Sequence, residues 1–185
     1  LFPVILKNKL SLEQLDLFSP NGGRQPFTEN EYVFPLCELE QKCLSEKYDA
    51  IIIGGGDLIR SDKTVVRSYE TEFITSLSLW QLPILIGHKL NIPVVFNSPG
   101  VPLEFSSKER KFVKELLSMV EYISVRDEFS KEKLEQCGVK NVEVIPDTVL
   151  SISKILPINK CNKIYNIIFI IVLGGINYGK MGLYV

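Results

Sequence analysis

Short, continuous apolar runs alternate along the chain with segments whose apolar residues recur at helical spacing. Apolar runs without polar alternation are typical of strands that are buried on both faces of a parallel sheet. The pattern therefore predicts strands over 48–53, 93–96, 122–125 and 142–145. It also predicts that both faces of these strands are covered.

Two of the intervening segments have the composition of core-facing helices. Segment 77–90 is apolar almost throughout, but it contains Pro83, which cannot donate a backbone hydrogen bond. We therefore expect one helix to end there and a second to begin. Segment 36–47 predicts an amphipathic helix, and its apolar face consists of Leu36, Leu39, Cys43 and Leu44.

Two further helices carry explicit start and stop signals. Ser106 and Glu109 have the spacing of a capping box. Asp127 is placed to cap a helix that Gly138 ends in a left-handed conformation. Residues 1–35 give no comparable pattern apart from a turn over 19–24. The predicted apolar face of the helix that follows Ser106 consists of Phe112, Leu116, Met119 and Val120.

Strands alternating with helices at this spacing indicate the α/β class, with a Rossmann-like open parallel sheet. We assign 1–152 to this N-terminal domain, and 153–185 to a linker and the start of a second domain. In open α/β sheets, ligands bind beyond the carboxyl ends of the strands. The loops selected by that rule are 54–57, 97–101, 126–127 and 146–147.

Composition excludes several classes of function. The 21 Lys and Arg residues balance 22 Asp and Glu residues, so no broad basic surface for nucleic acid is expected. The most apolar run, Ile164–Leu173, is about half of the roughly 18 residues that a membrane helix needs, and we predict a buried strand there. The start lacks Met and a signal peptide, so we expect it to lie inside a longer cytoplasmic protein.

Metal binding is not expected, because one His and four unclustered cysteines do not make a zinc site. We interpret the cysteines as reduced thiols that serve as small apolar residues. The single His88 lies late in a helix, where we expect a structural role, and Trp80 is expected in the core. The cysteines are Cys37, Cys43, Cys137 and Cys161.

The turn Gly54-Gly55-Gly56-Asp57 directly follows a predicted strand. Three glycines allow backbone N–H groups to approach an anion or a sugar, and Asp57 can hold or deprotonate a hydroxyl. The turn lacks the third glycine of a dinucleotide fingerprint and the Gly-Lys-Ser/Thr of a phosphate loop. A tight turn with Asp57 as a helix cap is the alternative interpretation.

Arg126 and Asp127 end another predicted strand within the motif S-x-R-D. The guanidinium fork of an arginine suits a carboxylate or a phosphate. A surface ion pair between Arg126 and Asp127, of little energetic consequence, is the alternative.

Taken together, these motifs resemble the polysaccharide pyruvyl transferase family. The resemblance covers about residues 36–152 and rests on the order of four features. They are the glycine-rich turn at 54–57, the strand and loop 93–100, the S-x-R-D motif at 124–127, and Pro146-Asp147.

The resemblance implies two Rossmann-like domains in an arrangement similar to GT-B glycosyltransferases. It implies transfer of pyruvate from phosphoenolpyruvate to two hydroxyls of a sugar or lipid-linked saccharide, without a further cofactor or metal. The setting would be the biosynthesis of a cell-surface polysaccharide or exopolysaccharide, with peripheral membrane association as an option. Asp57 is then the candidate catalytic residue. The candidate substrate-binding residues are Gly54, Gly55, Gly56, Asn97, Gly100, Ser124, Arg126 and Asp147.

Two departures from the family pattern affect these expectations. Residues 1–35 lack the glycine-rich turn that the family places after its first strand. The family's general acid is a His of the second domain, and no His follows His88, so we expect this chain to be inactive alone. A glycosyltransferase that uses a nucleotide sugar, and a non-catalytic module that binds a sugar or nucleotide, are the alternatives.

Overall fold

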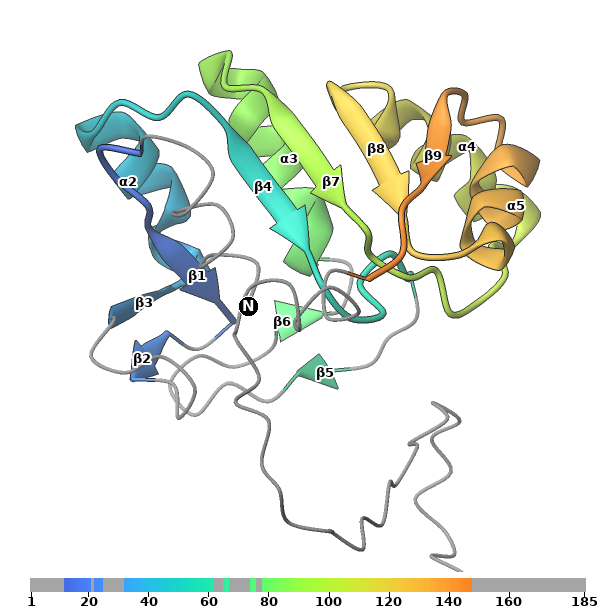
Figure 1. Cartoon of the computed structure of the whole chain (residues 1–185), viewed down its shortest axis with the longest axis horizontal. Coiled ribbons are helices and arrows are strands. Elements are labelled where there is room, and N and C mark those ends of the chain that lie inside the picture. The colour runs from blue at the N-terminus through green and yellow to red at the C-terminus, as the bar shows by residue number, and fades with distance from the viewer. Residues whose placement is uncertain are drawn as a thin grey trace, which may run out of the picture.

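The centre of the computed structural model is a four-stranded parallel sheet with the strand order β4-β7-β8-β9 (Figure 1). The structure describes residues 12–20, 22–24, 32–61, 65–66, 74–75 and 78–147. All four strands were predicted from their apolar runs, and they confirm the α/β class. Their bounds are Ile51–Gly54 for β4, Val94–Asn97 for β7, Tyr122–Val125 for β8 and Val142–Val144 for β9.

The two helices for which the sequence carries capping signals begin at the predicted residues. Asp127 accepts a hydrogen bond from the Ser130 amide at 2.7 Å, and Glu109 accepts one from the Ser106 amide at 2.7 Å. Gly138 has a φ of +82° at the end of its helix. The helices are η1 (Leu36–Glu38), α2 (Leu39–Ser45), α3 (Ser78–Leu90), α4 (Ser107–Leu117) and α5 (Glu128–Gln136).

The predicted break at Pro83 is wrong, because α3 runs through this residue without interruption. A proline in the second turn costs the helix one backbone hydrogen bond. The helix retains its apolar face in exchange, since Trp80 and Ile84 are both fully buried. Burial of two large side chains is worth several kcal/mol, which outweighs one lost hydrogen bond.

The prediction that both faces of the strands are covered is also wrong for β4. Ile53 and Phe96 face the main core, whereas Ile52 on the opposite face is 41% exposed. The strands follow one another in sequence across the sheet. Right-handed crossovers between strands that advance in one direction place every connecting helix on the same face. Helices α3, α4 and α5 accordingly lie on one side of the sheet in Figure 1.

Two smaller sheets flank this unit, and the sequence pattern predicted neither. One is formed by β1 (Leu17–Ser19), β2 (Gly23–Arg24) and β3 (Tyr32–Pro35), in the order β1-β3-β2. The other is the antiparallel pair of β5 (Val65–Val66) and β6 (Ile74–Thr75). The predicted turn before β2 is confirmed by Gly22, which has a φ of +63°.

Some predictions need a smaller correction or cannot be compared. Leu44 and Met119 were assigned to apolar faces, but they are 66% and 38% exposed, because each lies at or past the end of its helix. Cys37, Cys43 and Cys137 are unpaired, and Cys37 is exposed rather than a core residue. Cys161, the strand 164–173 and the segment 153–185 lie outside the described residues.

Candidate functional site

Three loops meet at the carboxyl edge of the parallel sheet and are joined by backbone hydrogen bonds. The amide of Gly100 donates to the carbonyl of Gly56 at 2.8 Å, and the amide of Ile59 donates to the carbonyl of Gly100 at 3.2 Å. The amide of Arg126 donates to the carbonyl of Pro99 at 3.3 Å. The loop after β7 is therefore held between the loops that follow β4 and β8.

Arg126 lies between two carboxylates in this arrangement. Its Nη2 donates to Asp57 Oδ1 at 2.5 Å, and its Nε donates to Asp127 Oδ2 at 3.2 Å. The Asp57 and Arg126 side chains are 36% and 35% exposed, so the pair is open to solvent. A guanidinium carries five N–H donors, and these two bonds use Nε and Nη2, whereas Nη1 has no hydrogen-bond partner among the described residues.

The pair joins residues that are 69 positions apart in the sequence. Two alternative interpretations need revision, namely Asp57 as a helix cap and Arg126 as the partner of Asp127 alone. No helix begins in residues 58–61, so Asp57 does not cap one. Arg126 is not confined to its neighbour Asp127, because the contact with Asp57 is the shorter of its two bonds.

Gly100 makes this pair possible by its lack of a side chain. A Cβ atom at this position would lie 2.5 Å from Asp57 Oδ1 and 2.7 Å from Arg126 Cζ. Gly100 is itself buried. Its place in the structure is therefore beneath the Asp57–Arg126 pair, where the backbone approaches the two side chains closely.

The glycine-rich turn presents its backbone to solvent. Gly54, Gly55 and Gly56 are exposed, and the φ angles of Gly55 and Gly56 are +85° and +60°. Side chains at those two positions would meet nothing within 4 Å, so the left-handed backbone is the physical reason for glycine. Asn97 lies beside Gly54, with its Nδ2 3.6 Å from where a Cβ of Gly54 would stand.

Ser124 is fully buried, and its hydroxyl is used within the protein. It donates to the carbonyl of Phe96 at 2.9 Å and accepts from the amide of Ser98 at 3.1 Å. The Ser124 hydroxyl thus links β8 to the end of β7 and to the first residues of the loop that follows it.

Ser98 is a residue that the sequence did not single out. It has a φ of +55°, which is uncommon for a residue with a side chain. It is 3% exposed, and its hydroxyl has no hydrogen-bond partner among the described residues. Backbone strain and unpaired buried polar atoms both concentrate at functional sites. No pattern in the amino-acid sequence signals either property.

The charge of Asp127 is stabilised by its surroundings. Burial pushes the pKa of this carboxyl upward, but hydrogen bonds from Ser130 and Arg126 outweigh burial and leave the pKa below its ordinary value of 3.8. Asp127 therefore stays ionised while it caps α5 and holds Nε of Arg126.

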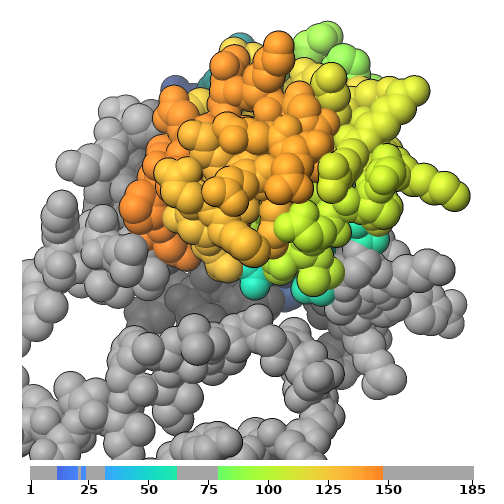
Figure 2. Space-filling view, turned by 90° about the vertical axis from the view of Figure 1, so that its right-hand side faces the viewer, coloured from blue at the N-terminus to red at the C-terminus, as the bar shows by residue number. Residues whose placement is uncertain are grey.

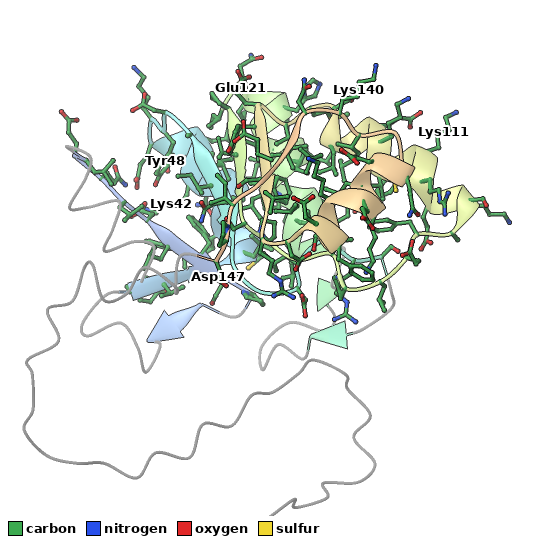
Figure 3. All side chains as sticks on the ribbon, turned by 45° about the vertical axis from the view of Figure 1, so that its right-hand side comes forward. Lys42, Tyr48, Lys111, Glu121, Lys140 and Asp147 are labelled. Atoms are coloured by element: carbon green, nitrogen blue, oxygen red, sulfur yellow. The ribbon has the colours of Figure 1, made fainter. Side chains whose placement is uncertain are left out.

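The remaining candidate, Asp147, follows β9 and lies at the same edge of the sheet as the three loops (Figure 3). Glu121, which precedes β8, lies at the opposite edge. The single His88 also belongs to that opposite edge, because it is exposed in the last turn of α3, which leads into the start of β7.

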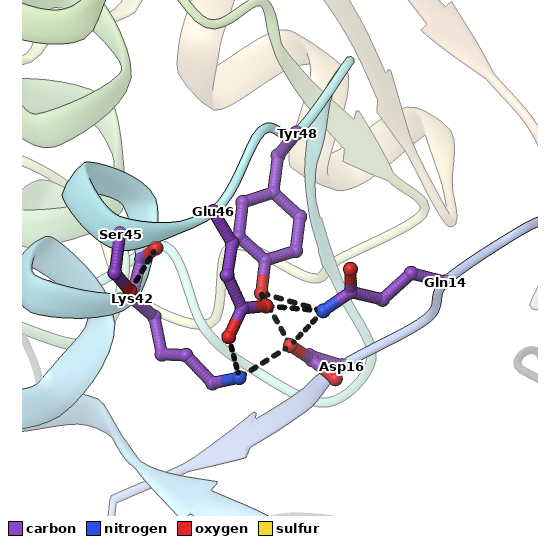
Figure 4. Close-up of polar contacts among 6 residues, drawn as sticks. All are labelled: Gln14, Asp16, Lys42, Ser45, Glu46 and Tyr48. Carbon is purple, nitrogen blue, oxygen red and sulfur yellow. Dashed lines mark hydrogen bonds and ion pairs between the residues drawn. The ribbon is translucent and has the colours of Figure 1, made fainter.

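A second polar cluster lies before the start of β4 (Figure 4). Tyr48 donates to Asp16 and to Glu46, and Lys42 Nζ lies 2.6 Å from Glu46 and 3.2 Å from Asp16. Gln14 donates to both carboxylates. These contacts tie β1 to α2 and to the connection with β4. Sequence reasoning missed the cluster because residues 12–20 show no pattern.

Ionisation in this cluster follows from the same contacts. Hydrogen bonds from Lys42, Gln14 and Tyr48 lower the pKa of Glu46 from 4.5 to about 2. Burial and the neighbouring carboxylates raise the pKa of Tyr48 above its ordinary value. The polar groups of the cluster form hydrogen bonds and ion pairs with one another. The cluster also lies at the edge of the sheet opposite to the three loops. We therefore assign the cluster a structural role.

Comparison with known families identifies the chain. The family model for polysaccharide pyruvyl transferase matches residues 4–183, and the chain belongs to this family. No curated protein and no solved structure matches it. Within the described residues, no helix is long and apolar enough to cross a membrane, and no three His, Cys, Asp or Glu side chains are grouped to hold a metal ion.

Proposed function

We propose that the carboxyl edge of the sheet binds phosphoenolpyruvate and that the protein transfers its pyruvyl group to a saccharide as a cyclic ketal. The observation that carries the proposal is the geometry of Arg126. Two carboxylates hold its guanidinium through Nε and Nη2, and Nη1 has no hydrogen-bond partner among the described residues. Membership of the pyruvyl transferase family supports the same chemistry.

Each candidate residue has a part in this proposal. Arg126 binds the carboxylate or the phosphate of the donor through paired N–H groups. The exposed amides of the glycine-rich turn, with Asn97 beside it, bind the other anionic end or the sugar. Gly100 provides the space for Arg126, and Ser124 supports the loop.

The reaction requires two proton transfers from the sugar. The methylene carbon of the donor gains a proton, two sugar hydroxyls add to the adjacent carbon, and phosphate leaves with the second proton. Asp57 binds Arg126 through Oδ1, and among the described residues Oδ2 remains to accept a hydroxyl proton. His88 does not supply the acid, since it lies at the opposite edge of the sheet.

The wider setting is part of the proposal. A second Rossmann-like domain, arranged as in GT-B glycosyltransferases, would bring the general acid to this edge. The acceptor would be a sugar or lipid-linked saccharide, and the product would enter a cell-surface polysaccharide or exopolysaccharide made in the cytoplasm. Asp147 lies at the edge where that acceptor would approach.

Donor binding tests the proposal with residues that this chain contains. Titration calorimetry of the 185-residue chain with phosphoenolpyruvate should show one site, and Arg126→Lys should weaken it about tenfold to a hundredfold. This is the loss expected when a point charge replaces a charge-assisted fork worth about 1.5–3 kcal/mol. Lys111→Ala is the control, because Lys111 is 83% exposed on the outside of α4 (Figure 3).

The alternative functions predict other ligands. Binding of a nucleotide sugar in place of phosphoenolpyruvate would favour a glycosyltransferase. Binding of a free saccharide alone would favour a non-catalytic module. Phosphoenolpyruvate affinity that is the same in Arg126→Lys, Arg126→Ala and wild type would show that Arg126 only supports the fold.

A further inference from the structure

Val101, in the loop after β7, makes hydrogen bonds to two residues of α5. The amide of Val101 donates to Ser130 Oγ at 2.9 Å, and its carbonyl accepts from Lys133 Nζ at 2.8 Å. Ser130 and Lys133 lie one turn apart on the same face of α5, so both polar groups of one residue are held by one helix. Figure 2 shows the segment near residue 100 lying directly against α5.

Lys133 is an unusual residue for this position. It is 3% exposed, although lysines are almost never fully buried without an ionic partner. Its ammonium contacts the Val101 carbonyl and lies 3.9 Å from the ring centroid of Phe129. No ion pair of the described residues includes Lys133. Retaining an unpaired charge in the interior costs stability, which points to a role other than packing.

Val101 is adjacent in sequence to a residue of the candidate donor site. Gly100 precedes Val101 and packs beneath the Asp57–Arg126 pair. Asp127, which holds Nε of Arg126, accepts the amide of Ser130 at 2.7 Å. The loop that Val101 anchors to α5 is therefore the same loop that lies beneath Arg126 and Asp57.

We propose that Lys133 is a positioning residue, which together with Ser130 fixes the loop after β7 so that Arg126 and Asp57 are held ready for the anionic donor. The affinity part of this inference rests on the proposed binding of phosphoenolpyruvate. The loop-fixing part rests only on the hydrogen bonds of Val101.

Lys133→Met is the first variant to test, because methionine keeps the unbranched stem and removes the ammonium. Phosphoenolpyruvate affinity, measured by titration calorimetry, should fall about tenfold or more. Lys131→Met, on the same helix, is the matched control and should bind as the wild type does. A role confined to packing predicts no change of affinity in either variant.

Hydrogen exchange provides a readout that does not depend on the donor. In Lys133→Met, the amides of Val101, Gly100 and Ile59 should exchange about tenfold faster, since they connect the loop to its neighbours. The amides of Ile51 and Glu121, which bond to the carbonyls of Pro93 and Val94 away from α5, should keep wild-type rates. Ser130→Ala removes the acceptor of the Val101 amide, so exchange at Val101 should be at least as fast as in Lys133→Met, and this variant replaces Lys133→Met if that variant does not fold.

The outcomes separate the two proposals. Failure of the wild-type chain to bind phosphoenolpyruvate counts against the proposed function, and the exchange rates still decide whether Lys133 fixes the loop. Unchanged exchange at Val101, Gly100 and Ile59 overturns the loop-fixing role. Faster exchange with unchanged donor affinity overturns the positioning role and leaves Lys133 a structural residue.

Discussion

Replacing Gly100 by alanine perturbs the candidate site with a single methyl group. Its Cβ would lie 2.5 Å from Asp57 Oδ1, 2.7 Å from Arg126 Cζ and 2.8 Å from Arg126 Nε. Gly100 does not have the left-handed backbone of Gly55 and Gly56, so alanine adds no conformational strain. The effect of Gly100→Ala therefore comes from displacing Asp57 and Arg126.

The magnitude follows from which atoms must move. They are the ends of two side chains that are 36% and 35% exposed, and not backbone atoms. A solvent-exposed ion pair contributes about 1 kcal/mol or less, so the free energy of unfolding should fall by no more than about 1 kcal/mol. The displaced guanidinium should lose about tenfold in phosphoenolpyruvate affinity, which equals about 1.4 kcal/mol.

Urea unfolding and titration calorimetry measure the two quantities on the same preparations. A double-mutant cycle with Arg126→Ala provides the control, because the guanidinium whose displacement lowers the affinity is then absent. Gly100→Ala should then add almost nothing to the loss of affinity caused by Arg126→Ala. Equal effects of Gly100→Ala in both backgrounds, or unchanged donor affinity in the single variant, would refute the role assigned to Gly100.

Three further predictions concern stability. Gly87→Ala should lower the free energy of unfolding, measured by urea unfolding, by about 1–3 kcal/mol. The reason is that its Cβ would overlap Val94 Cγ2 and lie 2.8 Å from the Ile92 carbonyl oxygen. A loss below about 0.5 kcal/mol, the level of a surface substitution, would contradict this packing. Ser98→Ala should leave that free energy unchanged or raise it by up to about 1 kcal/mol, since it removes an unpaired buried hydroxyl; a clear loss would mean that the hydroxyl is bonded. The lowered pKa of Glu46 stabilises the fold fully above about pH 4.5, and this contribution is lost as the pH falls toward about 2. Acid titration followed by circular dichroism should therefore show a shallower loss of stability in that range for Glu46→Gln than for wild type, and parallel curves would contradict the Glu46 interactions.

Local signals in the sequence were sufficient for most of the parallel sheet and its helices. Asp127 and Gly138 mark the ends of α5 because capping depends on residues within one turn. The rule that ligands bind at carboxyl ends of strands selected the loops that contain Asp57, Gly100 and Arg126. The structure brings these three residues into contact. Their binding and catalytic roles remain predictions.

Other features depended on contacts between distant segments. The continuity of α3 through Pro83 reflects the burial of Trp80 and Ile84, which local propensity does not contain. The exposure of Ile52 reflects the handedness of the crossovers, which places the helices on one face. An apolar run has the same appearance whether one or both of its faces are covered.

The amino-acid sequence by itself determined the order of the strands of the parallel sheet and of the helices between them, the caps of α4 and α5, and the loops at which chemistry is expected. The tertiary structure alone decided that Arg126 pairs with Asp57, that Gly100 lies beneath this pair, and that Lys133 holds Val101. The physical reason is the range of the interactions. Turns, caps and periodicity act within a few residues, whereas a hydrogen bond between two loops depends on the packing of every element that separates them.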